Sequence, residues 1–243
     1  MIPIVTYDEI DSTNAEARRR AEYGEAGPLW ITAGRQTAGR GRRGRTWETT
    51  TGNLAATYLT LTPRAPADAA QVSFVAAIAV AELAALHIEQ GLVRVKWPND
   101  VLISGVKTAG ILVESGRAPD GRLWLAVGIG VNLSRPPLVS ERPATAFAEH
   151  MAGPPPSPAR AIEDLAKSFA TWINAWDARG FAAVADAWTE RAYGLGERCI
   201  ARLPNETVSG IAEGLDVDGA LRLRLPDGSH RRITAGDVFF EDP

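Results

Sequence analysis

The residues best suited to binding an anion are five arginines and four glycines between Gly34 and Trp47. Glycine loses much conformational entropy in a regular element and neighbouring arginines repel one another, so we expect a loop here. Glycine lets backbone N–H groups approach a phosphate closely, and guanidinium groups clamp carboxylate or phosphate oxygens bidentately. The stretch therefore predicts a loop that closes over a charged ligand. Its basic residues are Arg35, Arg40, Arg42, Arg43 and Arg45, set among Gly34, Gly39, Gly41 and Gly44.

Two other interpretations of this loop stay open at the level of the loop alone. Runs of charge are often only solvated surface, and segments rich in arginine and glycine also bind nucleic acid. The formal net charge of the chain is -3, whereas a nucleic-acid binder is more often basic throughout. Base stacking would also need aromatic residues among the arginines, and only Trp47 lies nearby. We expect a local anion site and no binding to DNA.

Three other positions could contribute polar groups or space to the same site. Asp11 to Asn14 are four cap-forming residues before a helix predicted over residues 15–23; one of them suffices as a cap, so the others form a polar turn or face a ligand. Lys107 enters an apolar strand, either on the rim or aimed into a site. Gly128 and Gly130 remove side chains from one face of a strand, for close ligand approach or for tight packing.

Composition limits the remaining function classes. The chain has 243 residues, 45% hydrophobic and 23% charged, enough for one large core and a small second domain. Its single cysteine, Cys199, excludes an intramolecular disulfide and is expected in the core, and with three scattered histidines no Cys/His metal cluster is expected. Neither a leader-like start nor an apolar run of about 18 residues is present, so we expect a cytoplasmic protein without membrane contact.

The elements that must position these residues follow from periodicity. Strands are predicted over residues 1–5, 28–33, 53–61 and 123–133, with a strand meander over 93–114. Helices are predicted over 68–90, ended by Gly91, near 144–150, and over 159–179 and 181–192. Beyond Gly196, short strands with turns at Asp218 and Asp227 predict a barrel-type β domain. We expect a catalytic domain of residues 1–193 and a second domain of residues 194–243. The last two helices carry a stripe expected in the core: Phe169, Trp172, Trp176, Val184 and Trp188.

Taken together and in order, these motifs resemble those of biotin protein ligases. The resemblance implies an α+β fold of the class II aminoacyl-tRNA synthetase/biotin synthetase type, a mixed sheet with flanking helices, plus a small C-terminal SH3-like β-barrel. Because the first motif begins at Asp11, it suggests the monofunctional type that lacks an N-terminal DNA-binding domain. The motifs are residues 11–14, Gln36, residues 39–45, residues 96–100 (Lys-Trp-Pro-Asn-Asp), residues 107–112 and residues 128–132.

The resemblance implies an ATP-dependent biotin-[acetyl-CoA-carboxylase] ligase. Such an enzyme activates biotin to biotinyl-5'-AMP with release of pyrophosphate, then transfers biotin to a lysine of a biotin carboxyl carrier protein domain. Lipoate-protein ligases share the fold and the adenylate chemistry and remain the alternative. Whether the chain is a monomer or a homodimer stays open.

Site roles follow from the same resemblance. Arg42 and Lys107 would be catalytic, spanning the biotin carboxylate and the α-phosphate. Trp47 and Asn132 would lie on the adenine side, and magnesium would accompany ATP, with Asp100 as its candidate protein ligand. Thr108 stands where the family commonly has leucine. The biotin and adenylate site would comprise Ser12, Thr13, Asn14, Gln36, Gly39, Arg40, Gly41, Arg42 and Lys107.

Overall fold

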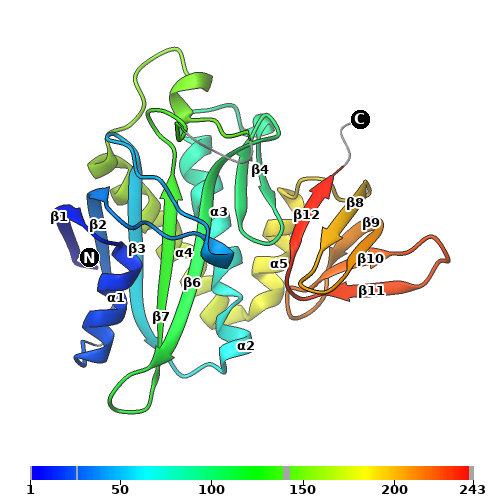
Figure 1. Cartoon of the computed structure of the whole chain (residues 1–243), viewed down its shortest axis with the longest axis horizontal. Helices are drawn as coiled ribbons and strands as arrows, with labels where there is room; N and C mark the ends of the chain where they lie inside the picture. The colour runs from blue at the N-terminus through cyan, green and yellow to red at the C-terminus, as the bar shows by residue number, and fades with distance from the viewer. Residues whose placement is uncertain (1, 26, 139–142, 241–243) are drawn as a thin grey trace.

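The computed structural model describes residues 2–25, 27–138 and 143–240. Across these residues the strands form a seven-stranded sheet, in the order β1-β2-β3-β7-β6-β5-β4, and a five-stranded sheet, in the order β11-β10-β9-β8-β12. Figure 1 shows the larger sheet with helices on both faces and the smaller sheet to one side. The strands of the larger sheet are β1 Ile4–Ile10, β2 Leu29–Gln36, β3 Leu54–Thr62, β4 Val93–Lys96, β5 Asp100–Ile103, β6 Val106–Arg117 and β7 Leu123–Val131.

The helices lie in three parts of the chain. The first helix follows β1, the next two follow β3, and the last two follow β7. They are α1 Thr13–Glu22, α2 Pro66–Ala69, α3 Val72–Ala85, α4 Pro158–Arg179 and α5 Phe181–Glu190, with 3-10 turns η1 Arg42–Gly44, η2 Gln90–Leu92 and η3 Phe147–His150.

The larger sheet is mixed, as expected. β1 pairs in parallel with β2, and the pairs from β2 to β4 across the sheet are antiparallel. β4 to β6 form the predicted meander, and β7 is the strand predicted over residues 123–133. The expected α+β class is confirmed, since the mixed sheet and the separate antiparallel sheet are both present.

Several element boundaries differ from the sequence prediction. α1 begins at Thr13 rather than at residue 15, because Ser12 is its N-cap. The first strand runs over Ile4–Ile10 rather than residues 1–5, because β2 supplies pairing partners along its whole length. The long helix predicted over residues 68–90 is two helices, and α3 ends at Ala85. Beyond that point the chain turns so that Ile88 is buried, while Leu86 stays exposed. Gly91 is therefore part of the 3-10 turn η2 and does not cap the helix.

Alternation along β2 shows how the sheet buries both faces. Leu29 and Ile31 pack with Ala17 and Ala21 of α1, whereas Trp30 belongs to the larger core on the side of α3 and α4. Because successive side chains of a strand point to opposite faces, one strand serves both layers. The sheet is thus a rigid floor with α1 on one side.

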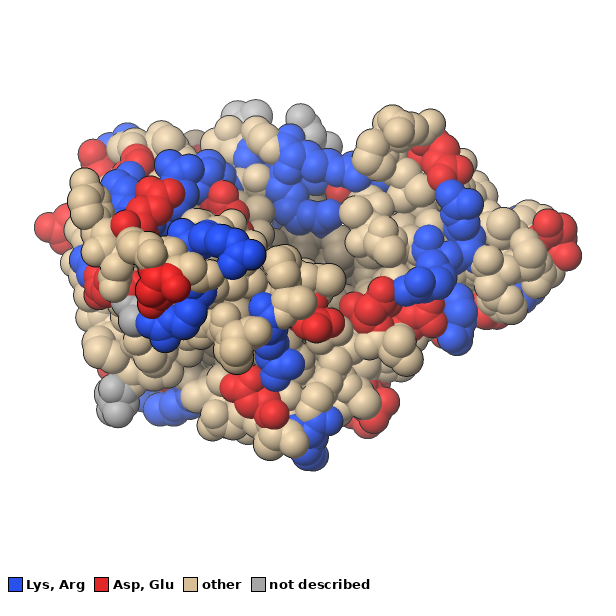
Figure 2. Space-filling view, turned by 90° about the horizontal axis from the view of Figure 1, so that it is seen from below, with Lys and Arg blue, Asp and Glu red and all other residues tan. Residues whose placement is uncertain are grey.

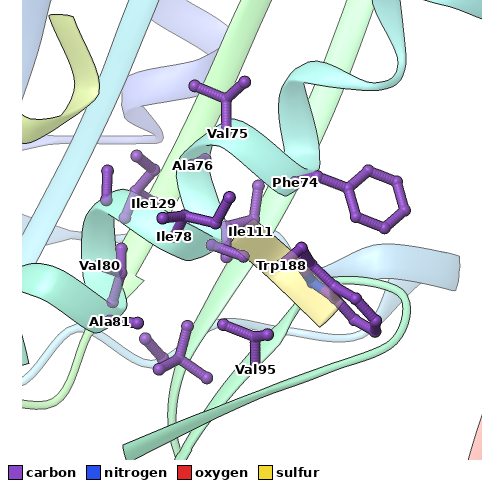
Figure 3. Close-up of a cluster of buried hydrophobic side chains, with 14 of the residues drawn as sticks. Phe74, Val75, Ala76, Ile78, Val80, Ala81, Val95, Ile111, Ile129 and Trp188 are labelled. Carbon is purple, nitrogen blue, oxygen red and sulfur yellow. The ribbon is translucent and has the colours of Figure 1, made fainter. Parts of the chain in front are cut away.

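The larger core forms between α3 and the middle strands. Figure 3 shows Ile78 and Val80 of α3 near Ile111 of β6 and Ile129 of β7, with Trp188 of α5 at the edge of the cluster. The segment Pro66–Ala85 is long and apolar enough to cross a membrane, but 72% of it is buried inside the protein. It is therefore accounted for as a core helix.

The expected core residues of the C-terminal half are confirmed. Trp176, Val184 and Trp188 are buried, and Trp172 is partly buried with its indole N–H donated to Glu82 (2.9 Å). Phe169 and Cys199 are likewise buried. The stripe therefore contributes to the packing of the core.

The second sheet has the predicted hairpins. Its strands are antiparallel, with turns around Asp218 and Asp227. It packs on the larger domain, where the Trp97 indole donates to the Gly219 carbonyl (3.0 Å). The strands are β8 Arg198–Arg202, β9 Thr207–Leu215, β10 Leu221–Arg224, β11 His230–Ile233 and β12 Asp237–Phe240.

Candidate active site

A cavity of about 900 Å³ opens between the arginine loop, the start of α1, the middle strands and the start of β12. Figure 2 shows basic and acidic side chains interspersed on one face of the molecule, with Lys and Arg gathered beside a hollow in it. Every residue that the sequence suggested for the site lines this cavity. They are Ser12, Thr13, Asn14, Gln36, Gly39, Arg40, Gly41, Arg42, Trp47, Asp100, Lys107 and Asn132.

The arginine loop has more structure than expected. Residues up to Gln36 continue β2, because β1 pairs with them and Glu9 forms an ion pair with Arg35 (2.6 Å). The loop then folds back on itself, and the N–H of Trp47 donates to the carbonyl of Gly39 (2.9 Å). A Cβ on Gly39 would lie 2.3 Å from the Trp47 carbonyl oxygen, so this close approach requires glycine.

The tip of the loop is a 3-10 turn, Arg42–Gly44, in which Arg43 has a φ of 57°. A non-glycine residue in this left-handed region is strained, and such strain is found at ligand-binding segments. The N–H of Gly41 donates to the carbonyl of Arg45 (2.7 Å), which closes the turn. The prediction that no regular element forms in this stretch is therefore wrong for residues 34–36, which belong to β2, and for the 3-10 turn at the tip.

Most loop arginines have a carboxylate partner from another part of the fold. Arg40 contacts Glu114 of β6 (2.8 Å). Arg45 and Arg43 both contact Asp237 at the start of β12, at 3.1 Å and 3.6 Å. The second domain thus holds the tip of the loop.

Arg42 differs from the other loop arginines. It donates to neutral acceptors, Asn99 Oδ1 (2.9 Å) and the Gly236 carbonyl (3.4 Å), and forms no ion pair with any residue of the described ranges. Burial lowers the pKa of its guanidinium, which nevertheless remains charged at neutral pH. Asp237 and Asp100 act on this cation only from beyond ion-pair distance, so an anionic ligand in direct contact would stabilise it strongly.

Lys107 lies in the wall of the cavity rather than on an open rim. Its Nζ is 2.6 Å from Asp100 Oδ1 and 5.7 Å from the centre of the Trp47 ring. Gly110 makes room for it, since a Cβ there would come within 3.2 Å of the Lys107 Nζ. The ammonium is therefore directed along the sheet into the site.

The glycines of β7 accommodate side chains of this chain. A Cβ on Gly130 would lie 2.2 Å from the Trp47 indole, and one on Gly128 would lie 2.3 Å from Asn14 Oδ1. Gly130 also pairs with Gly110 across the sheet, so the indole lies over two glycines. Both glycines therefore pack against side chains of this chain, and both also line the cavity.

The first turn of α1 supplies a polar wall. Ser12 is the N-cap, and its hydroxyl accepts from the Ala15 N–H (3.4 Å). Gln36 Oε1 accepts from the N–H of Thr13 (2.8 Å), and Asn14 Oδ1 accepts from the Thr57 hydroxyl (2.7 Å). These buried groups fix one another, which pre-organises the wall for a polar ligand.

Asn132 lies at the far side of the cavity. Its side-chain amide donates to the backbone carbonyl of Thr145 (3.0 Å), and its backbone carbonyl accepts from the hydroxyl of Thr108 (3.3 Å). Thr108 is fully buried, so its hydroxyl is satisfied within the strand pair that carries Lys107 and Asn132.

Several contributors were missed by the sequence analysis. Thr57, Asn99, Gly110, Glu114 and Asp237 all bind or pack against predicted site residues. Asn99 and Gly110 fall inside motifs already noted, and a closer reading could have included them. Asp237 carries no local signal, since it lies 192 residues from Arg45 in the chain.

The described residues contain no group of three or more His, Cys, Asp or Glu side chains arranged to hold a metal ion. The carboxylate nearest to Lys107 is that of Asp100, already engaged by the ammonium. The donor set therefore does not fit a metal cage built by the protein. It fits an ion that is held mainly by phosphates and water, with Asp100 as a single candidate ligand.

Known protein families match both domains. Residues 8–134 match the Biotin/lipoate A/B protein ligase family, and residues 194–241 match the Biotin protein ligase C terminal domain. The C-terminal match corresponds to the expected SH3-like module.

Relatives are similar over nearly the whole chain. The Biotin--[acetyl-CoA-carboxylase] ligase of Paracoccus denitrificans is 45% identical over 242 residues, 95% of this chain and 97% of that protein. The Bifunctional ligase/repressor BirA of Bacillus subtilis is 31% identical, over 97% of this chain and 73% of that protein.

Solved structures of biotin protein ligases have a similar fold. A biotin protein ligase from Aquifex aeolicus in complex with biotin and ATP has a TM-score of 0.82 at 24% identity, covering 99% of both chains. One from Leishmania major in complex with biotinyl-5-AMP has a TM-score of 0.63 at 25% identity, covering 96% of this chain and 99% of that chain. With its two family matches, its cavity and these relatives, the chain belongs to the biotin/lipoate A/B protein ligase family.

Proposed function

We propose that this chain is an ATP-dependent biotin-protein ligase that forms biotinyl-5'-AMP and transfers biotin to a lysine of a carboxyl carrier protein. One observation carries the proposal most directly. Asn99 accepts from Arg42, and the next residue, Asp100 at the start of β5, contacts Lys107, so consecutive residues hold both cations. Two cations held in one cavity match a reaction between two anions.

The first step joins a carboxylate to a phosphate. A biotin carboxylate oxygen attacks the α-phosphorus of ATP, the bond from that phosphorus to the bridging oxygen breaks, and pyrophosphate leaves with the electron pair. The carboxylate is already ionised at neutral pH, so no general base is needed. Arg42 and Lys107 supply fixed positive charge to the carboxylate and α-phosphate oxygens, which repel one another in water.

The second step consumes the mixed anhydride. The uncharged lysine amine of the carrier attacks the acyl carbon, the carbon–oxygen bond to AMP breaks, AMP leaves as an anion, and the new amide nitrogen releases one proton to water. The same two cations stabilise the leaving phosphate. Arg40, Gly39 and Gly41, in the loop over the cavity, would limit access of water to the anhydride.

The polar wall is suited to the head of biotin. Ser12, Thr13, Asn14 and Gln36 offer hydroxyl and amide groups that match a ureido ring, and their mutual hydrogen bonds hold them in place. On the opposite side Asn132 would face the adenine. Trp47 would lie between the polar wall and Asn132, where its indole covers Gly110 and Gly130.

Magnesium belongs to this proposal as a companion of ATP. When bound, it would neutralise phosphate charge. Asp100 is the residue that could hold it, and the remaining ligands would come from phosphates and water. The carrier domain is the proposed macromolecular partner, and a cytoplasmic location is proposed from the family.

Lipoate is the competing acid, since the family description includes lipoate ligases. The C-terminal match to a biotin protein ligase domain favours biotin. Exchange of radiolabelled pyrophosphate into ATP separates the two, because it requires the cognate acid. We expect exchange with biotin and magnesium and none with lipoate; exchange with lipoate alone would reverse the assignment, and exchange with neither would remove the proposed chemistry.

A further inference from the structure

Glu114 of β6 joins two parts of the site without touching the cavity. Its Oε2 accepts from Asn14 Nδ2 (2.8 Å) and from an NH2 group of Arg40 (2.8 Å). Asn14 belongs to the polar wall and Arg40 to the arginine loop. Among the described residues that line the cavity Glu114 is not present, so it can act on a ligand only through these two neighbours.

The contact of Glu114 with Asn14 is rigid. Asn14 is 4% exposed, packs on Gly128, and accepts from the Thr57 hydroxyl (2.7 Å). Its amide also donates to the Leu112 carbonyl (3.2 Å). With the carbonyl and the amino group both engaged, this amide has one orientation, and it holds the Glu114 carboxylate in place.

The contact of Glu114 with Arg40 is adaptable. The Arg40 side chain is 41% exposed and belongs to a loop whose tip is strained at Arg43. A carboxylate fixed at one end to the sheet and bound at the other to a loop can set the position of that loop.

We propose that Glu114 is a positioning residue that aligns Arg40 with the Asn14 wall and so couples biotin binding at that wall to nucleotide binding under the loop. The inference rests on the proposed function. The alternative is an ordinary surface ion pair. Arg35 and Glu9 form such a pair at 2.6 Å, with side chains 66% and 51% exposed, and serve as the exposed comparison pair.

The test uses the full chain and Glu114→Gln. The amide keeps an acceptor oxygen for Asn14 but removes the negative charge that attracts Arg40. The affinity for a non-hydrolysable ATP analogue is measured with and without saturating biotin, and the ratio of the two affinities is the coupling. We expect this ratio to fall about 2- to 5-fold, the range that a partly exposed ion pair supplies. Glu9→Gln should leave it unchanged.

The inference is overturned if Glu114→Gln and wild type show the same ratio of ATP-analogue affinities, even if the variant binds biotin more weakly. A wild-type ratio of one would also overturn it, because there would then be no coupling to transmit. Thermal unfolding checks that the variant is folded. If it is not, Glu114→Asp carries the test, because it keeps the charge but is too short to reach both partners, and a reduced ratio is again expected. Failure of the proposed function is distinct, since the wild type would then show no biotin-dependent pyrophosphate exchange.

Discussion

Gly130→Ala tests whether the Trp47 indole stays packed on Gly130 and Gly110 during the reaction. The new Cβ would lie 2.2 Å from the indole, whereas carbon atoms in contact prefer about 3.5–4.0 Å. The ring would have to move by more than an ångström. Its backbone cannot follow freely, because the Trp47 N–H donates to the Gly39 carbonyl (2.9 Å). Part of the loop must therefore rise with the ring.

The expected magnitude follows from that displacement. Overpacking of a well-packed contact costs about 1–3 kcal/mol. If the closed loop bears this cost, biotin-dependent adenylate formation falls by about 5- to 150-fold at low substrate concentration. The folded state is affected less, since the loop can open while the sheet stays intact.

Pyrophosphate exchange measures the activity, and thermal unfolding measures the stability. Gly116→Ala is a control on neighbouring β6, where a Cβ would come within 2.7 Å of Trp124 and not of a cavity residue. It should lower stability without selective loss of exchange. Normal exchange by Gly130→Ala would refute the reasoning, since it would mean that Trp47 leaves these two glycines before the chemistry.

Three further predictions concern charged residues. Arg42→Ala and Lys107→Ala should each lower adenylate formation by about 10² or more with little effect on unfolding, and near-normal exchange in both would contradict their assigned roles. Asp237→Asn should speed tryptic cleavage of the loop by up to about 5-fold, because it removes a partly exposed ion pair with Arg45 that is worth at most about 1 kcal/mol. Cleavage as slow as in wild type would show that the second domain does not hold the loop. The hydrogen bond from Arg19 lowers the pKa of Asp11 from 3.8 to about 2, so its contribution to stability is present above about pH 4 and is lost as the pH falls through 2. Asp11→Asn should lose less unfolding free energy than wild type over that interval in urea titrations, and equal losses would argue against the pair.

The sequence was sufficient to predict the parts of the site that lie in compact motifs. The cap-forming residues before α1, the arginine loop and Lys107 are close in the chain to the elements that carry them. The residue types of the loop were suited to an anion but left solvated surface and nucleic-acid binding open, and the resemblance to biotin protein ligases supplied the roles. The meander and the terminal hairpins followed from alternation and turn residues.

What could not be predicted depends on contacts that are distant in the chain. The partner of Arg45 is 192 residues away, and that of Arg40 is 74 residues away. Neither carboxylate belongs to a pattern that distinguishes it from other surface acids. Likewise, the end of α3 depends on burial of Ile88, which a periodic apolar pattern does not determine.

The pairing of the cations has a consequence for how the ligand binds. Lys107 already contacts Asp100, so an incoming phosphate must replace or share an existing partner, and the net gain is smaller than for a free charge. Arg42 donates hydrogen bonds only to neutral acceptors in the described part of the chain, and Asp237 and Asp100 act on it from beyond ion-pair distance, so no direct ion pair has to be exchanged there. The gain from a new anion should therefore be largest at Arg42. Loss of Arg42 should accordingly weaken binding of the adenylate more than loss of Lys107 does, even where both variants lose the chemical step.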